Sequence, residues 1–263
     1  MPYHQIAEEA RKRYDRFAKA YRAIDASTTD QELRSHYGKI ITLLCRSFNR
    51  PITVLDLGCG TGRYFHCLDN VQNLIGIDAS SEMLKEARQP IHQEQINIPH
   101  TELICGDFLS QFFPTESFDL IYSIGVLGEY APLDKTICQK LNAWLKPGGK
   151  LFFSVVDAAS IPTTQSLKRC IAEGLYRILP PGWKSKVRQE RLWQLLYLTE
   201  TQLKEILKAG DLSDVTINRF GVEATDGWVG AHFDCFTTKP VASNQQTLQY
   251  SASQKHQTPL IEP

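Results

Sequence analysis

The chain has 263 residues and a formal net charge of zero, because 29 Lys and Arg residues balance 29 Asp and Glu residues. This balance provides no basic field to concentrate nucleic acid, so we expect neither DNA nor RNA as the main substrate. No apolar run reaches the roughly 18 residues of a membrane span, and the N-terminus has no signal-peptide pattern. The seven scattered cysteines form no Cys-x-x-Cys pair, which favours a reducing, cytoplasmic location without a bound metal.

Two helices are expected ahead of the first strand, over residues 4–25 and 31–48. In the first helix, apolar side chains such as Tyr14, Phe17 and Tyr21 recur at three- and four-residue steps. A stripe at this spacing usually packs on a core. The pattern therefore predicts that this helix packs on the domain.

A buried strand then runs into a glycine turn. After apolar β-formers, Gly58, Gly60 and Gly62 stand at every second position, and a helix-compatible segment follows. Glycines in such a turn allow positive φ and let a ligand approach the bare backbone. A dinucleotide fingerprint would need a glycine where Arg63 stands, and no Gly-Lys-Ser/Thr follows for a phosphate loop. We expect the turn to end a strand and to open a helix.

Strands and helices alternate after this turn, which implies a parallel sheet with right-handed crossovers. More strands of this sheet are expected over residues 74–78, 103–107, 118–123 and 150–156. Helices should start near residue 79 and cover 133–145, and Lys146–Gly149 should form a turn.

The regular alternation of strands and helices ends at residues 158–198, which we predict to form a helical insert after the fifth strand. Its tryptophans and arginines could contact a hydrophobic or anionic small molecule, or the arginines could form a solvated helix face. A helix over 199–209 and two antiparallel strands near 214–220 and 230–238 should follow. The tail at 240–263 has few large apolar residues and is expected to be disordered.

Polar or flexible residues stand at the carboxyl ends of the expected strands. Asp78 ends the second strand, Asp107-Phe108 ends the third, and Ser123-Ile124-Gly125 ends the fourth. In an open parallel sheet, ligands bind beyond these ends, where the strand order reverses. The pattern predicts one ligand site built from several strand ends.

The run from Asp56 to Gly62, hydrophobic-Asp-x-Gly-x-Gly-x-Gly, resembles the first motif of class I S-adenosylmethionine-dependent methyltransferases of small-molecule type. This resemblance implies an α/β, Rossmann-like seven-stranded sheet, mostly parallel with the last strand antiparallel, and helices on both faces. Residues 50–239 would form the methyltransferase domain, 1–49 an N-terminal helical extension, and 158–198 a lid. The resemblance also offers a second role for the first helix, as a flap that closes over the cofactor.

The resemblance implies S-adenosyl-L-methionine as cofactor. Asp78 would accept from the ribose hydroxyls, Asp107 from the adenine amino group, and Phe108 would stack on the adenine, while Asp56 would orient the methionine ammonium. Further cofactor contacts are expected from Gly58, Cys59, Gly60, Gly62, Ala79, Met83, Gly106, Ser123, Ile124, Tyr14 and Tyr21. The alternatives are a helix N-cap at Asp78, and a loop acid with a core phenylalanine at Asp107 and Phe108.

The acceptor is less well defined by the sequence, because the cofactor itself carries the difficult chemistry. The segment after the fourth strand lacks the Asn/Asp-Pro-Pro-Tyr/Phe motif of amide and exocyclic-amine methyltransferases, which disfavours DNA-adenine and protein-glutamine acceptors. Glu129 and Tyr130 could contact the acceptor or act as a base, or they could be an exposed loop pair. His232 is a further candidate base, or a structural histidine.

The resemblance implies transfer of a methyl group to an O, N or C nucleophile of a small-molecule metabolite by in-line displacement, and we expect a biosynthetic role. A monomer or homodimer is expected. The alternatives are a cofactor-binding scaffold without activity and a nicotinamide oxidoreductase. The first is disfavoured by the acids at positions 56, 78 and 107, and the second by Arg63.

Overall fold

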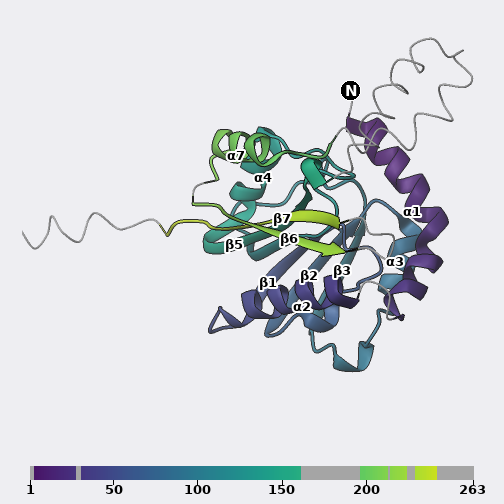
Figure 1. Ribbon diagram of the computed structural model, residues 1–263. Coiled ribbons are helices and arrows are strands. Elements are labelled where there is room, and N and C mark those ends of the chain that lie inside the picture. The colour runs from purple at the N-terminus through teal and green to yellow at the C-terminus, as the bar shows by residue number, and fades with distance from the viewer. Residues whose placement is uncertain (1–2, 28–30, 161–195, 213, 224–228, 242–263) are drawn as a thin grey trace, which may run out of the picture.

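One seven-stranded sheet organises the protein (Figure 1). The computed structural model describes residues 3–27, 31–160, 196–212, 214–223 and 229–241. The strand order is β3-β2-β1-β4-β5-β7-β6, and β7 is antiparallel to both of its neighbours while the strands from β3 to β5 are parallel. The strands are β1 (Ile52–Leu57), β2 (Val71–Asp78), β3 (His100–Cys105), β4 (Phe118–Ser123), β5 (Leu145–Val156), β6 (Thr216–Glu223) and β7 (Val229–Thr238). This topology confirms the predicted Rossmann-like sheet.

Helices cover both faces of the sheet, as predicted. They are α1 (Tyr3–Asp25), α2 (Gln31–Arg46), α3 (Ser81–Ala87), α4 (Lys135–Trp144) and α7 (Glu200–Ala209), with 3₁₀ turns at Phe65–Cys67, Gln93–Gln95 and Ala158–Ser160. One apolar core joins the sheet to α4 and α7, and the other joins it to α2 and α3. Phe152 and Phe153 are consecutive in β5, point to opposite faces, and are both fully buried. A strand that is covered on both faces therefore has a continuous apolar sequence instead of an alternating one.

Polar side chains define the starts of the shorter helices. Ser80 caps α3 by accepting from the Met83 amide, and Asp134 caps α4 by accepting from the Ile137 amide at 2.9 Å. Thr199 opens α7 with a capping box. Such caps contribute about 1 kcal/mol each, which helps helices of seven to ten residues to form.

The sequence predictions were wrong at two places near the sheet. The glycine turn opens a 3₁₀ turn at Phe65–Cys67 instead of an α-helix, because only Leu68–Asn70 remain before β2 begins. The turn expected at Lys146–Gly149 lies inside β5, where the register against β4 shifts between Phe118 and Leu120. Gly148 has a φ of 76°, so the glycines permit a bulge that the strand continues through.

Helix α1 lies beyond the strand ends, beside α3 (Figure 1). Its Ala10 and Ala18 are buried, which supports the predicted packing, but Phe17 is 44% exposed and lies outside the buried stripe. Helix α2 shares its core with β1, since Tyr37 and Ile41 pack in the same cluster as Ile52. The division of the chain into three parts stays a prediction. Most of the predicted insert, residues 161–195, and the tail from residue 242 lie outside the described residues.

Candidate functional site

A cavity of about 440 Å³ lies at the carboxyl ends of the parallel strands. Its floor is the point where the strand order reverses, between β1 and β4, and α1 and α2 contribute to its walls. All the residues predicted for the site line it, except Gly62 and Ser123. Those that line it are Tyr14, Tyr21, Asp56, Gly58, Cys59, Gly60, Asp78, Ala79, Met83, Gly106, Asp107, Phe108, Ile124, Glu129, Tyr130 and His232.

The glycine turn presents bare backbone to this cavity. A Cβ added at Gly60 would meet nothing within 4 Å, whereas one at Gly58 would lie 2.3 Å from a methyl carbon of Val126. Both residues have positive φ, as the sequence predicted for such a turn. Gly62 also has positive φ, but a Cβ there would meet the Phe65 ring at 2.8 Å. Gly62 therefore shapes the turn and does not line the cavity.

Asp78 holds the glycine turn and the start of α3 together. Its two carboxylate oxygens accept from the Gly60 amide at 2.9 Å and from the Ser80 amide at 2.8 Å. Burial raises the pKa of Asp78, and these two hydrogen bonds oppose the rise. Ser80 is the N-cap of α3, so the alternative reading of Asp78 as the cap is wrong. Each oxygen keeps capacity for one further donor.

Asp107 has one satisfied and one unsatisfied oxygen. Its Oδ1 accepts from the Leu109 amide at 2.9 Å, while Oδ2 is buried without a hydrogen-bond partner among the described residues. A buried carboxylate oxygen without a donor is costly. Next to it, Phe108 is almost fully buried but still reaches the cavity wall. This corner of the cavity therefore lacks one hydrogen-bond donor beside an aromatic ring.

Asp56 lies under the cavity floor and pairs with a tyrosine that the sequence analysis did not identify. The Tyr122 hydroxyl donates to Asp56 at 2.6 Å across β1 and β4. Burial raises the pKa of Asp56 to about 7, although the Tyr122 hydrogen bond opposes this shift. Ser123 differs from its prediction. It is fully buried, and its hydroxyl donates to the Leu57 carbonyl, so it joins β4 to β1 and Ile124 reaches the cavity in its place.

Aromatic side chains surround the other end of the cavity. The ring of Tyr14 lies 5.4 Å from that of Tyr21 and 5.1 Å, edge to face, from that of Tyr130. Enclosure raises the pKa of Glu129 to about 7. Glu129 and Tyr130 line the cavity and are half-buried, so the alternative of an exposed loop pair is wrong.

His232 lines the cavity from β7. Its Nδ1 is buried with no hydrogen-bond partner among the described residues. Burial lowers its pKa, and nearby His36 lowers it further, so the ring is neutral at pH 7. A histidine satisfied by structural hydrogen bonds would pair this nitrogen, so the ring remains available to a ligand.

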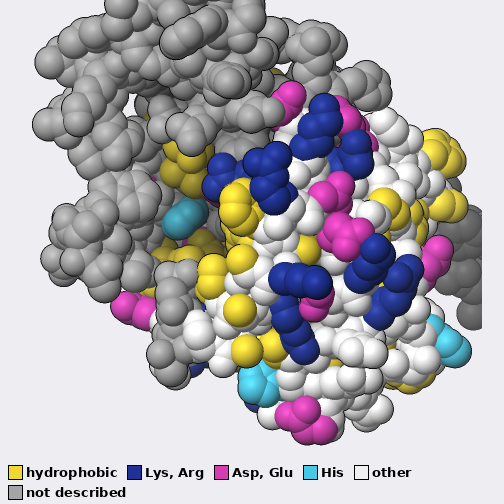
Figure 2. Space-filling view, turned by 90° about the vertical axis from the view of Figure 1, so that its right-hand side faces the viewer, with side chains coloured by type: hydrophobic (Ala, Val, Ile, Leu, Met, Phe, Trp, Pro, Cys, Tyr) yellow, Lys and Arg dark blue, Asp and Glu magenta, His cyan; other side chains and the backbone are white. Residues whose placement is uncertain are grey.

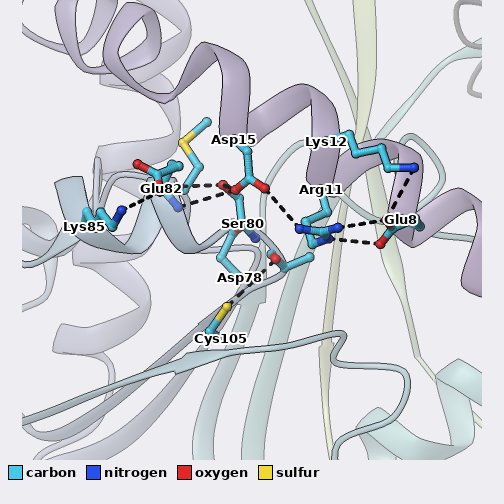
Figure 3. Close-up of polar contacts among 11 residues, drawn as sticks. Glu8, Arg11, Lys12, Asp15, Asp78, Ser80, Glu82, Lys85 and Cys105 are labelled. Atoms are coloured by element: carbon cyan, nitrogen blue, oxygen red, sulfur yellow. Dashed lines mark hydrogen bonds and ion pairs between the residues drawn. The ribbon is translucent and has the colours of Figure 1, made fainter.

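Two acids of α1 anchor this helix to the loops of the cavity, and the sequence analysis did not identify either. Asp25 is buried and accepts from the Thr61 hydroxyl and the Arg63 guanidinium of the glycine turn. Asp15 accepts from the Ser80 hydroxyl at 2.7 Å at the start of α3 (Figure 3). No local pattern marks these contacts, because each joins segments more than 35 residues apart.

Within the described ranges, no group of three or more His, Cys, Asp or Glu side chains is placed to hold a metal ion. None of the described helices is long and apolar enough to cross a membrane. On the face that carries α1, Lys and Arg side chains are interspersed with Asp and Glu (Figure 2). The described side chains of this face therefore form a mixed surface and not a continuous basic one.

Comparison with known proteins identifies the family. A family model described as "Methyltransferase domain" matches residues 54–149, which span the glycine turn and β1 to the middle of β5. The malonyl-[acyl-carrier protein] O-methyltransferase of Priestia megaterium is 30% identical over 203 residues, which cover 74% of this chain and 69% of that protein. The chain belongs to the class I S-adenosylmethionine-dependent methyltransferases.

Further relatives of this methyltransferase support the same family assignment. The ubiquinone biosynthesis O-methyltransferase of Coxiella burnetii is 29% identical over 178 residues, 63% of this chain and 74% of that protein. Magnesium protoporphyrin IX methyltransferase from Synechocystis PCC 6803, solved with bound S-adenosylhomocysteine, shares the fold with a TM-score of 0.52 at 16% identity, over 78% of this chain and 82% of that chain. The cofactor of this methyltransferase is S-adenosylmethionine.

Proposed function

We propose that this methyltransferase transfers the methyl group to a nucleophilic atom of a small-molecule metabolite, by in-line displacement in the cavity at the strand ends. The observation that carries the proposal is the continuity of this cavity. It joins the glycine turn, Asp78 at the end of β2 and Asp107 after β3 to the aromatic end beneath α1. Cofactor and acceptor would therefore share one enclosed space. The relatives named as O-methyltransferases support oxygen as the nucleophile.

The residues of the cavity fit the cofactor. The spare acceptor capacity on Asp78 suits the two ribose hydroxyls, and the unsatisfied oxygen of Asp107 suits the adenine amino group. The open space above Gly60 allows close approach of the cofactor to the backbone. A methionine ammonium close to Asp56, which Tyr122 holds by a hydrogen bond, would add the positive charge that favours an ionised carboxylate.

The sulfonium of the bound cofactor supplies an electrophilic methyl group. The chain must then hold the acceptor in line with the breaking bond and exclude water. Alignment of two reactants in one site can contribute roughly 7–11 kcal/mol. Tyr14 and Tyr21 of α1, with Tyr130, form the wall that would position the acceptor and exclude water from this end of the cavity.

The test combines binding with turnover. Calorimetry should detect S-adenosylhomocysteine binding to the wild type, and Asp78→Ala should weaken it by at least tenfold. Asp69→Ala, which removes an exposed acid paired with Arg46, is the matched control and should leave the affinity unchanged. The wild type should transfer labelled methyl groups from S-adenosylmethionine to one or more members of a pool of small metabolites.

The alternatives give different results in the same experiment. A scaffold would bind the cofactor product and transfer no label, and an oxidoreductase would bind NAD in its place. Equal S-adenosylhomocysteine affinity in wild type and Asp78→Ala would remove the assignment of Asp78. A cytoplasmic location and a monomeric or homodimeric state stay predictions from the sequence.

A further inference from the structure

We propose that Glu129 is the general base of this transfer and that the acceptor presents a phenolic hydroxyl on a planar ring. The inference rests on the proposed function, which it deepens by naming the acceptor class and the group that takes its proton. It is carried by the position of the Glu129 carboxylate, the aromatic walls around it, and the pairing of the cations that line the cavity.

The Glu129 carboxylate lies over the strand ends where the methionine part of the cofactor would bind. A Cβ added at Gly125 would be 3.7 Å from its Oε2, so the carboxylate is directed back over the end of β4. The next residue along this loop, Val126, contacts the glycine turn at Gly58. Glu129 is therefore directed at the junction of β1 and β4, where the strand order reverses.

The loop holds this position by its own backbone. The amides of Glu129, Tyr130 and Ala131 all donate to the Val126 carbonyl, at 3.2, 2.9 and 2.9 Å. The Gly128 amide donates back to the Ala131 carbonyl at 2.7 Å, which closes the turn. A side chain on such a turn is directed by the backbone, so Glu129 is preorganised at the cavity wall.

The groups that face Glu129 come from several segments of the protein. The charged one among the described residues is Arg13 of α1, and the phenols that interact electrostatically with it are Tyr14, Tyr37, Tyr130 and Tyr197. Enclosure raises the pKa of Glu129 to about 7, against a hydrogen bond from Tyr130 and the charge of Arg13. A carboxylate in this range is a stronger base than an exposed one and is still largely ionised just above neutral pH.

The acceptor class follows from the walls and the charges. Tyrosine rings whose centroids lie 5.1 and 5.4 Å apart form surfaces on which a planar ring packs well. The arginines that line the cavity within the described residues, Arg11 and Arg63, are both ion-paired, with Glu8 and Asp25. The charge of each arginine is already balanced by its partner, which disfavours a carboxylate or phosphate on the acceptor, so an uncharged acceptor fits better.

The hydroxyl is phenolic because its acidity suits the base. A phenol ionises near pH 10, within about three units of a carboxylate of this kind, whereas an aliphatic alcohol is far less acidic. As the phenolic oxygen forms its bond to the methyl carbon, Glu129 accepts the hydroxyl proton. The carbon–sulfur bond breaks with its electron pair on sulfur. The products are an aryl methyl ether, S-adenosylhomocysteine and protonated Glu129, which then releases its proton to solvent.

The test uses Glu129→Gln, which keeps the size of the side chain and removes the base. Glu94→Gln, an exposed and distant position, is the matched control. Wild type and variants are assayed with labelled S-adenosylmethionine against three acceptor sets: phenols of graded acidity, aliphatic alcohols and amines. We expect the wild type to prefer phenols. The value of kcat/KM for the phenol should rise with pH through about 7 when S-adenosylmethionine is saturating, so that the bound ammonium keeps Asp56 ionised and only Glu129 titrates. Glu129→Gln should lower kcat/KM roughly 100-fold or more and lose this pH step.

Two readouts separate a base from a structural role. The loss in Glu129→Gln should shrink for acidic nitrophenols, which are already ionised at neutral pH and need no base. Without any turnover, the infrared band of protonated carboxyl groups that titrates near pH 7 should lose its Glu129 component in Glu129→Gln and keep the component of Asp56, whose pKa is also raised to about 7. Both proteins should bind S-adenosylhomocysteine within about twofold.

The results that overturn the inference are distinct from those that overturn the proposed function. Methylation of amines or aliphatic alcohols in preference to phenols, an unchanged pH step in Glu129→Gln, or an equal loss for acidic and ordinary phenols would each refute it while leaving a methyltransferase. If the pH step is lost in His232→Gln and kept in Glu129→Gln, the base is His232 instead. Failure of the wild type to methylate any acceptor, with S-adenosylhomocysteine still bound, would remove the proposed function itself.

Discussion

The unsatisfied oxygen of Asp107 leads to a prediction about which base the cofactor site recognises. The substitution Asp107→Asn keeps Oδ1 for the Leu109 amide and places an NH₂ group where the buried Oδ2 lies. If Oδ2 accepts from the adenine amino group, the variant brings two donors together. A hydrogen bond to a charged group contributes about 1.5–3 kcal/mol. Since 1.4 kcal/mol is tenfold, the Kd for S-adenosylhomocysteine should rise roughly 10- to 150-fold.

The same variant should gain relative affinity for S-inosylhomocysteine, in which a carbonyl oxygen replaces the amino group. The new NH₂ group of Asn can donate to that oxygen, so the preference for the adenine compound should fall by at least tenfold. Calorimetry with both ligands measures this ratio, and urea unfolding of the free protein checks that the variant is folded. An unchanged ratio in a folded variant would show that Asp107 does not contact the base.

Three further predictions concern the glycine turn and the buried acids. Gly60→Ala should cost about 1 kcal/mol of stability and weaken S-adenosylhomocysteine binding more than tenfold. Gly62→Ala should mainly destabilise the fold, because its Cβ meets the Phe65 ring. Calorimetry measures the affinity and urea unfolding measures the stability of each variant, and the reverse pattern would contradict the assignment. Asp25→Ala leaves Arg63 without its partner and should lower the free energy of unfolding by about 3 kcal/mol, and a loss below about 1 kcal/mol would contradict a buried pair. Burial alone would raise the pKa of Asp119, but hydrogen bonds from Arg50 and Lys146 lower it overall. The free energy of unfolding of the wild type should therefore fall as the pH drops from about 4 through this lowered pKa. Asp119→Asn should lose less stability over the same range. Parallel curves of unfolding free energy against pH for the two proteins would exclude Asp119 as the cause.

Much of the cofactor end could be predicted from local sequence. Three glycines at alternate positions after an apolar strand favour a turn, since glycine adopts positive φ without strain, and an acid after such a strand lies at the carboxyl edge of a parallel sheet. Asp56, Asp78 and Asp107 could therefore be placed at one edge without a structure. The regular alternation of strands and helices fixed the fold class for the same reason, since hydrophobic period and turn chemistry are properties of short segments.

Where periodicity and turn chemistry competed with packing, the sequence prediction failed. The segment after Gly62 has helix-forming residues, but it must return to β2 within a few residues and forms a 3₁₀ turn. The Pro-Gly-Gly at 147–149 has the composition of a turn, yet β5 continues through it. Leu145 and Lys150 pair with β4 on either side, and Gly148 and Gly149 exchange backbone hydrogen bonds with Lys239. Propensity is a weak prior that a tertiary contact can override.

What remained for the tertiary structure is the set of contacts between distant segments. Asp25 meets Arg63, Tyr122 meets Asp56, and the Glu129 carboxylate turns back over Gly125. The sequence by itself implied the cofactor, because the resemblance that points to it is carried by a short motif at the end of β1. The placement of the proposed acceptor end, with its enclosed carboxylate among tyrosines of α1, α2 and the loop after β4, was decided only by packing. The burial that changes the pKa of Glu129 exists only once these segments meet, so no local pattern could have encoded it.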